Sequence, residues 1–156
     1  MQDFDTLPNV TVTRESSVTP AAIWKILSDL PALPEWAPGI DGAEVTSDQN
    51  TGVGAVRRVA TAQFGQIEHH VTVWDEGAVF AYQTADSGPF SRTLTTYTIR
   101  PTSDGSAKVT VTLAFDTKPG TMEPDQAKDI LNKGLTATLA ALEMRARMAA
   151  DVAQAL

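Results

Sequence analysis

The chain has 156 residues, which fits a single domain spanning residues 1–156 and suffices to bury a core without metals or crosslinks. Twelve Lys and Arg against nineteen Asp and Glu give a formal charge of −7, which disfavours binding to nucleic acid or anionic membranes. The absence of cysteine excludes disulfides, thiolate catalysis and cysteine-rich zinc sites. Because residues 1–9 lack the apolar run of a signal peptide and no stretch is long enough for a membrane span, we expect a cytoplasmic protein.

The first predicted elements are a strand and two short helices. In residues 9–15 valines alternate with threonines, a pattern typical of a half-buried strand. Thr19 followed by Pro20 indicates a helix start, because threonine can cap the free amides and proline has no N–H to leave unpaired. Proline follows at position 31, and because a residue before proline is disfavoured in a helix, this helix is predicted to end near residues 29–30. Residues 33–39 permit one more short helical turn and then a bend.

The middle of the chain, residues 42–117, has the composition of strands throughout. Short segments rich in Val, Thr and aromatic residues are separated by Gly-, Asp- and Asn-rich turns, which predicts a meander of about six antiparallel strands. The clearest strand is predicted at 108–117. Its apolar residues alternate with polar ones and share one face: Val109, Val111, Leu113 and Phe115.

The last segment, residues 124–156, is predicted to be one long helix with acids near its start. Within it, Gly134 costs about 1 kcal/mol relative to Ala, and is tolerated either because the sheet passes close or because space is kept there. Only this helix is long enough to cover the apolar face of the meander, which predicts an α+β fold with a cavity between sheet and helix. One apolar stripe follows helical spacing: Ile130, Leu131, Leu135, Thr138, Leu139, Leu142 and Ala146.

Several short segments resemble a known superfamily by their order and spacing. They are 18–24 with 27–29, 33–40, 52–58, 65–68 with Val71 and 74–75, and 97–101 with 104–105.

Over about residues 10–147 the sequence resembles the SRPBCC (START-like) superfamily and, within it, the bacterial polyketide cyclase/dehydrase and lipid-transport family. The resemblance implies the helix-grip fold, in which a curved antiparallel sheet wraps around a long C-terminal helix and two short helices follow the first strand. It also implies a hydrophobic ligand in the cleft. It brings no fixed catalytic motif, because activities vary across the family.

The two histidines, His69 and His70, are adjacent on a predicted strand and must face opposite sides. They therefore cannot chelate one metal ion, and no metal or cofactor site is predicted. His69 shares its parity with Ile67, Val71 and Val73, so we expect it to point into the cleft and His70 outward. A neutral imidazole in an apolar cleft can act as a general acid or base, whereas the plainer interpretation is a hydrogen-bonded core histidine.

Arg57 and Arg58 also alternate, so a regular strand directs one of them inward. An inward guanidinium can orient a ligand carboxylate or polarise an enolate. The favoured interpretation is a rim arginine paired with an acid such as Glu68, since surface pairing is the common fate of arginine. The sequence leaves open which of the two faces the cleft.

The remaining candidate ligand contacts are apolar or aromatic. Tyr97 shares parity with an isoleucine two residues on and is a better inward candidate than Tyr82, although both can be plain core residues. Trp36 is expected at the mouth of the cavity, and Leu131 and Leu135 on its helical wall. Two other aromatic residues are interpreted as core: Trp24 and Phe115.

Three functions are consistent with these patterns. The first is a binder or carrier of a small hydrophobic molecule, lipid-like or polyketide-like. The second is a polyketide cyclase or dehydratase that uses His69 as general acid or base, with an inward arginine and Tyr97 as orienting groups. The third is a chaperone-activator-like interaction module without a ligand. Whether the protein is an enzyme, and whether it is a monomer or a homodimer, stay open.

Overall fold

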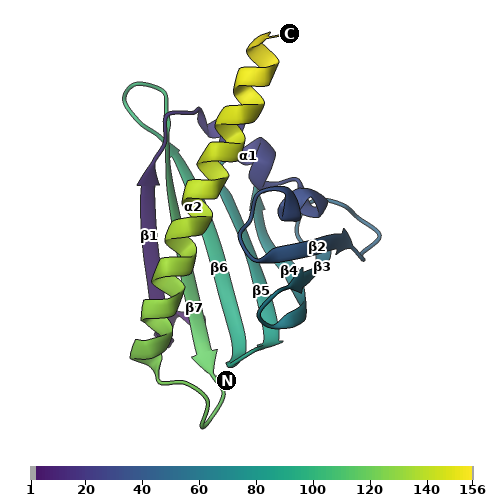
Figure 1. Cartoon of the computed structure of the whole chain (residues 1–156), viewed down its shortest axis with the longest axis vertical. Helices are drawn as coiled ribbons and strands as arrows, with labels where there is room; N and C mark the ends of the chain where they lie inside the picture. Colours follow the sequence, from purple (N-terminus) through teal and green to yellow (C-terminus); the bar gives the residue numbers. More distant parts are fainter. Residues whose placement is uncertain (1–2, 156) are drawn as a thin grey trace.

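The computed structural model describes residues 3–155, which form a curved antiparallel sheet with a long helix lying across one face (Figure 1). Seven strands pair in the order β1-β7-β6-β5-β4-β3-β2, so the predicted six-strand meander is confirmed and the first strand extends it beside β7. The elements, with η for 3-10 helices, are η1 (Phe4–Thr6), β1 (Asn9–Glu15), α1 (Pro20–Leu27), η2 (Leu30–Glu35), β2 (Ile40–Val45), β3 (Val56–Thr61), β4 (Gly65–Asp75), β5 (Val79–Ser87), β6 (Phe90–Pro101), β7 (Ala107–Thr117) and α2 (Pro124–Ala155).

The predicted start of α1 is confirmed, and its end comes slightly earlier than expected. The Ala22 amide donates to the Thr19 hydroxyl over 3.2 Å, so threonine caps the helix as the sequence predicts. The helix ends at Leu27 because the backbone of Asp29 leaves the helical region, with ψ at 85°. The chain then re-enters a tighter helix, η2, which begins at Leu30 with proline as its second residue.

The inner face of the sheet follows the predicted alternation except at one point in β4. Along β6 and β7, Tyr97 lies opposite Val111 and all predicted inward residues of β7 are buried. A bulge between Val71 and Val73 shifts the register of β4, so Val73 is exposed and the expectation that it shares a face with His69 is wrong. Beyond the bulge Trp74 faces inward, with its ring 5.2 Å from that of Trp24.

Helix α2 covers the inner face with part of the predicted stripe. Leu135, Leu139, Leu142 and Ala146 are buried in one hydrophobic core that includes Trp24 and Phe115, as predicted. Ile130 is 44% exposed, so its expected burial is wrong. The helix packs mainly on β1 and α1, while its first turns also border an open pocket.

Gly134 lies in these first turns, and a Cβ built on it meets no atom within 4 Å. The structure therefore supports the explanation that space is kept beside Gly134 and not the explanation that the sheet passes close to it. Gly134→Ala is expected to raise the free energy of unfolding by about 0.5–1 kcal/mol, because alanine has the higher helix propensity.

Urea unfolding of the purified variant measures this increase. Gly120→Ala is the matched control, because a Cβ there also meets open space but its φ of 74° is strained for alanine. Gly120→Ala is expected to destabilise the protein, and a loss of stability in Gly134→Ala would contradict the open-space explanation.

Candidate functional site

A pocket of about 230 Å³ opens between the first half of α2 and the end of the sheet. Leu131 and Leu135, the two helix residues predicted to contact a ligand, both lie on its wall. Across from them lie Phe64, in the β3–β4 turn, and Phe90, at the start of β6. Pro38 rather than the predicted Trp36 borders the pocket, while Trp36 packs against the core at the end of η2. A hollow reachable from solvent therefore exists at the helix–sheet interface.

A second group of candidate residues lies deeper, on the inner face of β3 and β4. Arg57 and His69 are directly paired across these two strands, and both are buried, with 2% and 8% of their surface exposed. The Arg57 guanidinium donates to the Leu30 carbonyl over 3.2 Å and to Nδ1 of His69 over 2.8 Å. The His69 ring stacks on Tyr82 with 4.0 Å between centroids. None of these side chains borders the 230 Å³ pocket.

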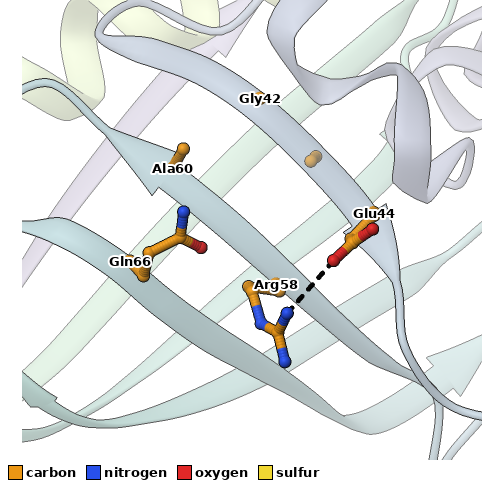
Figure 2. A pocket seen from close by; sticks show the side chains of 6 residues that line it. Gly42, Glu44, Arg58, Ala60 and Gln66 are labelled. Atoms are coloured by element: carbon orange, nitrogen blue, oxygen red, sulfur yellow. Dashed lines mark hydrogen bonds and ion pairs between the residues drawn. The ribbon is translucent and has the colours of Figure 1, made fainter.

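The structure resolves which arginine faces inward. Arg57 points to the interior, so the favoured interpretation of a rim arginine paired with an acid is wrong for it. That interpretation is right for Arg58, which lies on the outer face and forms a 3.1 Å ion pair with Glu44 on β2. Glu68, the partner named from the sequence, instead contacts His70. Figure 2 shows Arg58 and Glu44 beside Gln66 in a separate pocket of about 480 Å³ on the outside of the sheet.

The hydrogen bond from Arg57 fixes the protonation of His69. Because a guanidinium only donates, Nδ1 of His69 must be the acceptor, and the proton of the neutral ring is on Nε2. Burial, and next the positive charge of Arg57, lower the pKa of His69 well below its usual value, so the ring is neutral at pH 7. His70, by contrast, is exposed, as predicted. His69 therefore presents an N–H donor, not a free basic nitrogen, to the interior.

Arg57 carries a buried charge without a counter-ion. It forms no ion pair within residues 3–155, and its Nε is buried without a hydrogen-bond partner there. Burial lowers the pKa of Arg57, while the nearby Tyr82 and Tyr97 oppose that shift, but a guanidinium remains protonated at any physiological pH. A buried charge is normally paired, since desolvation of an isolated ion is costly.

Both predicted tyrosines lie on the inner face. Tyr97 is buried, and burial raises its pKa strongly. Tyr82 is directly opposite Val71 and Thr95, and its pKa is also raised by burial, while the charge of Arg57 acts in the other direction. Tyr82 nevertheless keeps part of its surface accessible, as does Ile67, which precedes His69 by two residues.

Sequence reasoning missed three polar contributors to the interior. The Leu30 carbonyl accepts from Arg57, but a backbone acceptor in a tight helix leaves no mark in a sequence. Thr93 and Thr95 are buried on β6, and their parity with Tyr97 was the available signal. Within residues 3–155 no three His, Asp or Glu side chains converge as metal ligands.

Residues 8–151 of this chain match a protein family described as "polyketide cyclase / dehydrase and lipid transport". The chain belongs to this family. Its membership agrees with the resemblance seen in the sequence and with the helix-grip arrangement of sheet and α2. For the polyketide cyclase/dehydrase and lipid-transport family as a whole, fold and membership point to ligand binding or a cyclase-like role.

Solved structures of low sequence identity share the family fold. A START superfamily protein from Mycobacterium smegmatis is 22% identical, with a TM-score of 0.77 over 90% of this chain and 97% of that one. The ZhuI aromatase/cyclase from Streptomyces sp. R1128 is 18% identical, with a TM-score of 0.74 over 89% and 93% of the two chains. No curated protein sequence matches this chain. Within residues 3–155, neither helix has both the length and the apolar character needed to cross a membrane.

Proposed function

We propose that this protein binds a small, mainly apolar molecule carrying one anionic or strongly polarised oxygen. The observation that supports this most directly is the buried guanidinium of Arg57, which has no acidic partner within residues 3–155. A ligand carboxylate, enolate or phenolate would supply the missing negative charge.

The surrounding donors favour an oxygen ligand over a cationic one. Nε of Arg57 is buried without a hydrogen-bond partner in the described chain. The Nε2–H of His69 is a second donor, because Nδ1 is occupied by Arg57. Two donors without acceptors at the Arg57–His69 pair match a group that only accepts hydrogen bonds.

The apolar part of the ligand is assigned to the pocket beside α2. Leu131 and Leu135 provide its helical wall, and Phe64 and Phe90 lie across from them. A lipid-like acid or an acidic polyketide-like aromatic compound has this combination of an apolar body and one charged end.

A second candidate function is cyclisation or dehydration of a polyketide-like substrate. It is favoured by the pairing of a guanidinium with a neutral imidazole donor, since both stabilise the enolate oxygen that develops next to a reacting carbon. The ZhuI aromatase/cyclase has the same fold, though its low identity transfers no residue roles. In this version His69 acts as a hydrogen-bond donor rather than as the general acid or base.

Dye binding tests the proposed ligand class with two probes that share one aromatic skeleton. 8-Anilino-1-naphthalenesulfonate carries an anionic group, whereas N-phenyl-1-naphthylamine is uncharged. The wild-type protein is expected to bind both. Arg57→Met is expected to lower the affinity for the anionic dye by at least about 30-fold, because the charge of the dye loses its buried partner. The affinity for the uncharged dye is expected to fall by less than about threefold.

Arg58→Met is the matched control, because this neighbouring arginine lies on the outer face and pairs with Glu44. It is expected to leave both affinities unchanged. Equal losses for the two dyes in Arg57→Met would contradict the anionic-ligand assignment. If neither dye binds the wild-type protein, and native mass spectrometry finds no co-purifying small molecule, an interaction module without a ligand is favoured.

The cyclase version is tested on a poly-β-ketone substrate with two variants of His69. Gln places a donor N–H near the position of Nε2, whereas Phe keeps the stack on Tyr82 but donates nothing. Turnover is expected to fall about 100-fold in His69→Phe and to be largely kept in His69→Gln. Equal loss in both would indicate acid–base chemistry, and no turnover by the wild-type protein would leave binding as the function.

A further inference from the structure

Several large apolar residues in the C-terminal half of α2 are exposed to solvent. Met144, Met148 and Val152 are 63%, 54% and 61% exposed, on the side of the helix opposite the buried Leu139 and Leu142. A surface helix normally carries charged and polar residues there. Figure 1 shows that the C-terminal turns of α2 extend past the strands and are not covered by another element.

Met144 and Met148 belong to a regular pattern along α2, which we name the outer stripe. Its members alternate by four and three residues, the heptad spacing of a helix that packs along a second helix. The outer stripe avoids the buried residues that cover the sheet, but its first half, Ile130, Gly134 and Ala137, also borders the 230 Å³ pocket. It consists of Ile130, Gly134, Ala137, Ala141, Met144 and Met148.

We propose that the outer stripe binds the same stripe of a second copy of this chain, with the two α2 helices antiparallel. A two-fold axis beside residues 142 and 143 places every large side chain opposite a small one, so the helices can approach closely. The opposed pairs, one residue from each copy, are Ile130 with Ala155, Ala137 with Met148, and Ala141 with Met144.

Charge supports the same register. Lys133 and Asp151 lie on one flank of the outer stripe, and the two-fold axis brings Lys133 beside Asp151 of the second copy, twice per dimer. Both are exposed, and neither forms an ion pair within residues 3–155. A parallel pair would instead place methionine beside methionine and would separate Lys133 from Asp151 by about 27 Å along the helix axis. Self-complementarity therefore favours a second copy over an unrelated partner.

Disulfide crosslinking tests the register, because the chain has no cysteine of its own. Ala137→Cys and Met148→Cys are purified separately, then mixed and oxidised. The mixture is expected to yield a crosslinked dimer, since these positions face each other across the two-fold axis. Each variant alone is not, because its two cysteines would be about 16 Å apart along the helix axis. Crosslinking of Ala137→Cys alone, or no crosslink in the mixture, would overturn the proposal.

Sedimentation equilibrium tests the association itself. Lys133→Glu and Asp151→Lys are each expected to raise the dimer dissociation constant about 3- to 10-fold, and the double variant to restore it. Met148→Glu is expected to abolish association. Val53→Glu, at an apolar residue 59% exposed outside the outer stripe, is expected to leave it unchanged. A wild-type monomer at all concentrations, or failure of the charge exchange to restore association, would overturn the proposal.

Discussion

The free energy of unfolding is expected to rise by about 1–4 kcal/mol when Arg57 and His69 are replaced together by Met and Phe. In the ligand-free protein the guanidinium is desolvated without an acidic partner, and the imidazole is its main side-chain acceptor. Met and Phe remove the cost of burying the guanidinium and the cost of burying the polar imidazole. They are similar in size to Arg and His, so the interior stays filled and the stack on Tyr82 is kept. The measurement is urea unfolding of the ligand-free proteins.

The single variants separate this effect from general packing. His69→Phe alone is expected to lower stability by about 1–3 kcal/mol, because Arg57 then loses an acceptor while its charge stays buried. Arg58→Met, on the exposed face, is expected to change stability by less than about 0.5 kcal/mol. A double variant less stable than His69→Phe would show that the buried guanidinium is itself stabilising.

The second large effect is a loss of stability in mild acid. The pKa of His69 is lowered well below 6.5 in the folded protein, so the folded ring stays neutral while the unfolded chain takes up a proton below pH 6.5. The unfolded state therefore binds more protons in this range, and stability falls with falling pH by about 1.4 kcal/mol per pH unit. The loss begins below about pH 6.5 and continues until the pH reaches the lowered pKa of the folded ring, and above pH 6.5 the stabilising contribution of the neutral ring is complete.

Urea unfolding at several pH values measures this slope, and the histidine pair gives a matched control. His69→Phe is expected to abolish the slope between pH 6.5 and 5, whereas His70→Gln is expected to keep it, because His70 is exposed. Asp86 and Asp104 have lowered pKa values, caused by Lys118 and by a hydrogen bond with Thr102, and lose their contribution only below about pH 4. A slope unchanged in His69→Phe would contradict the assignment.

The fold was predictable because its signals are repeated along the chain. Alternation identified the inner face of β7, turn residues separated the strands of the meander, and the Thr19–Pro20 pair marked the start of α1. The resemblance to the polyketide cyclase/dehydrase and lipid-transport family rested on the order of several short segments, and the match over residues 8–151 bears it out. None of these signals depends on one residue, so single irregularities did not affect the result.

The site was only partly predictable, because its details depend on single positions. Parity placed His69 inward correctly, but a bulge after Val71 reversed the orientation expected for Val73. Neither Arg57 nor Arg58 carries a local mark that separates buried from exposed. The donor role of His69 depends on a hydrogen bond from the neighbouring strand, which no one-dimensional pattern contains.

The direct pairing of Arg57 with His69 also has a consequence for how the β3–β4 hairpin forms. A hairpin slipped by one residue would turn Arg57 to solvent and bring Arg58 into the interior, away from the Leu30 carbonyl and the imidazole. Because two identical side chains stand next to each other, bulk and charge alone cannot reject that misalignment. The cross-strand contact between guanidinium and imidazole selects the correct alignment, so the chain uses one buried polar contact to distinguish two nearly equivalent pairings.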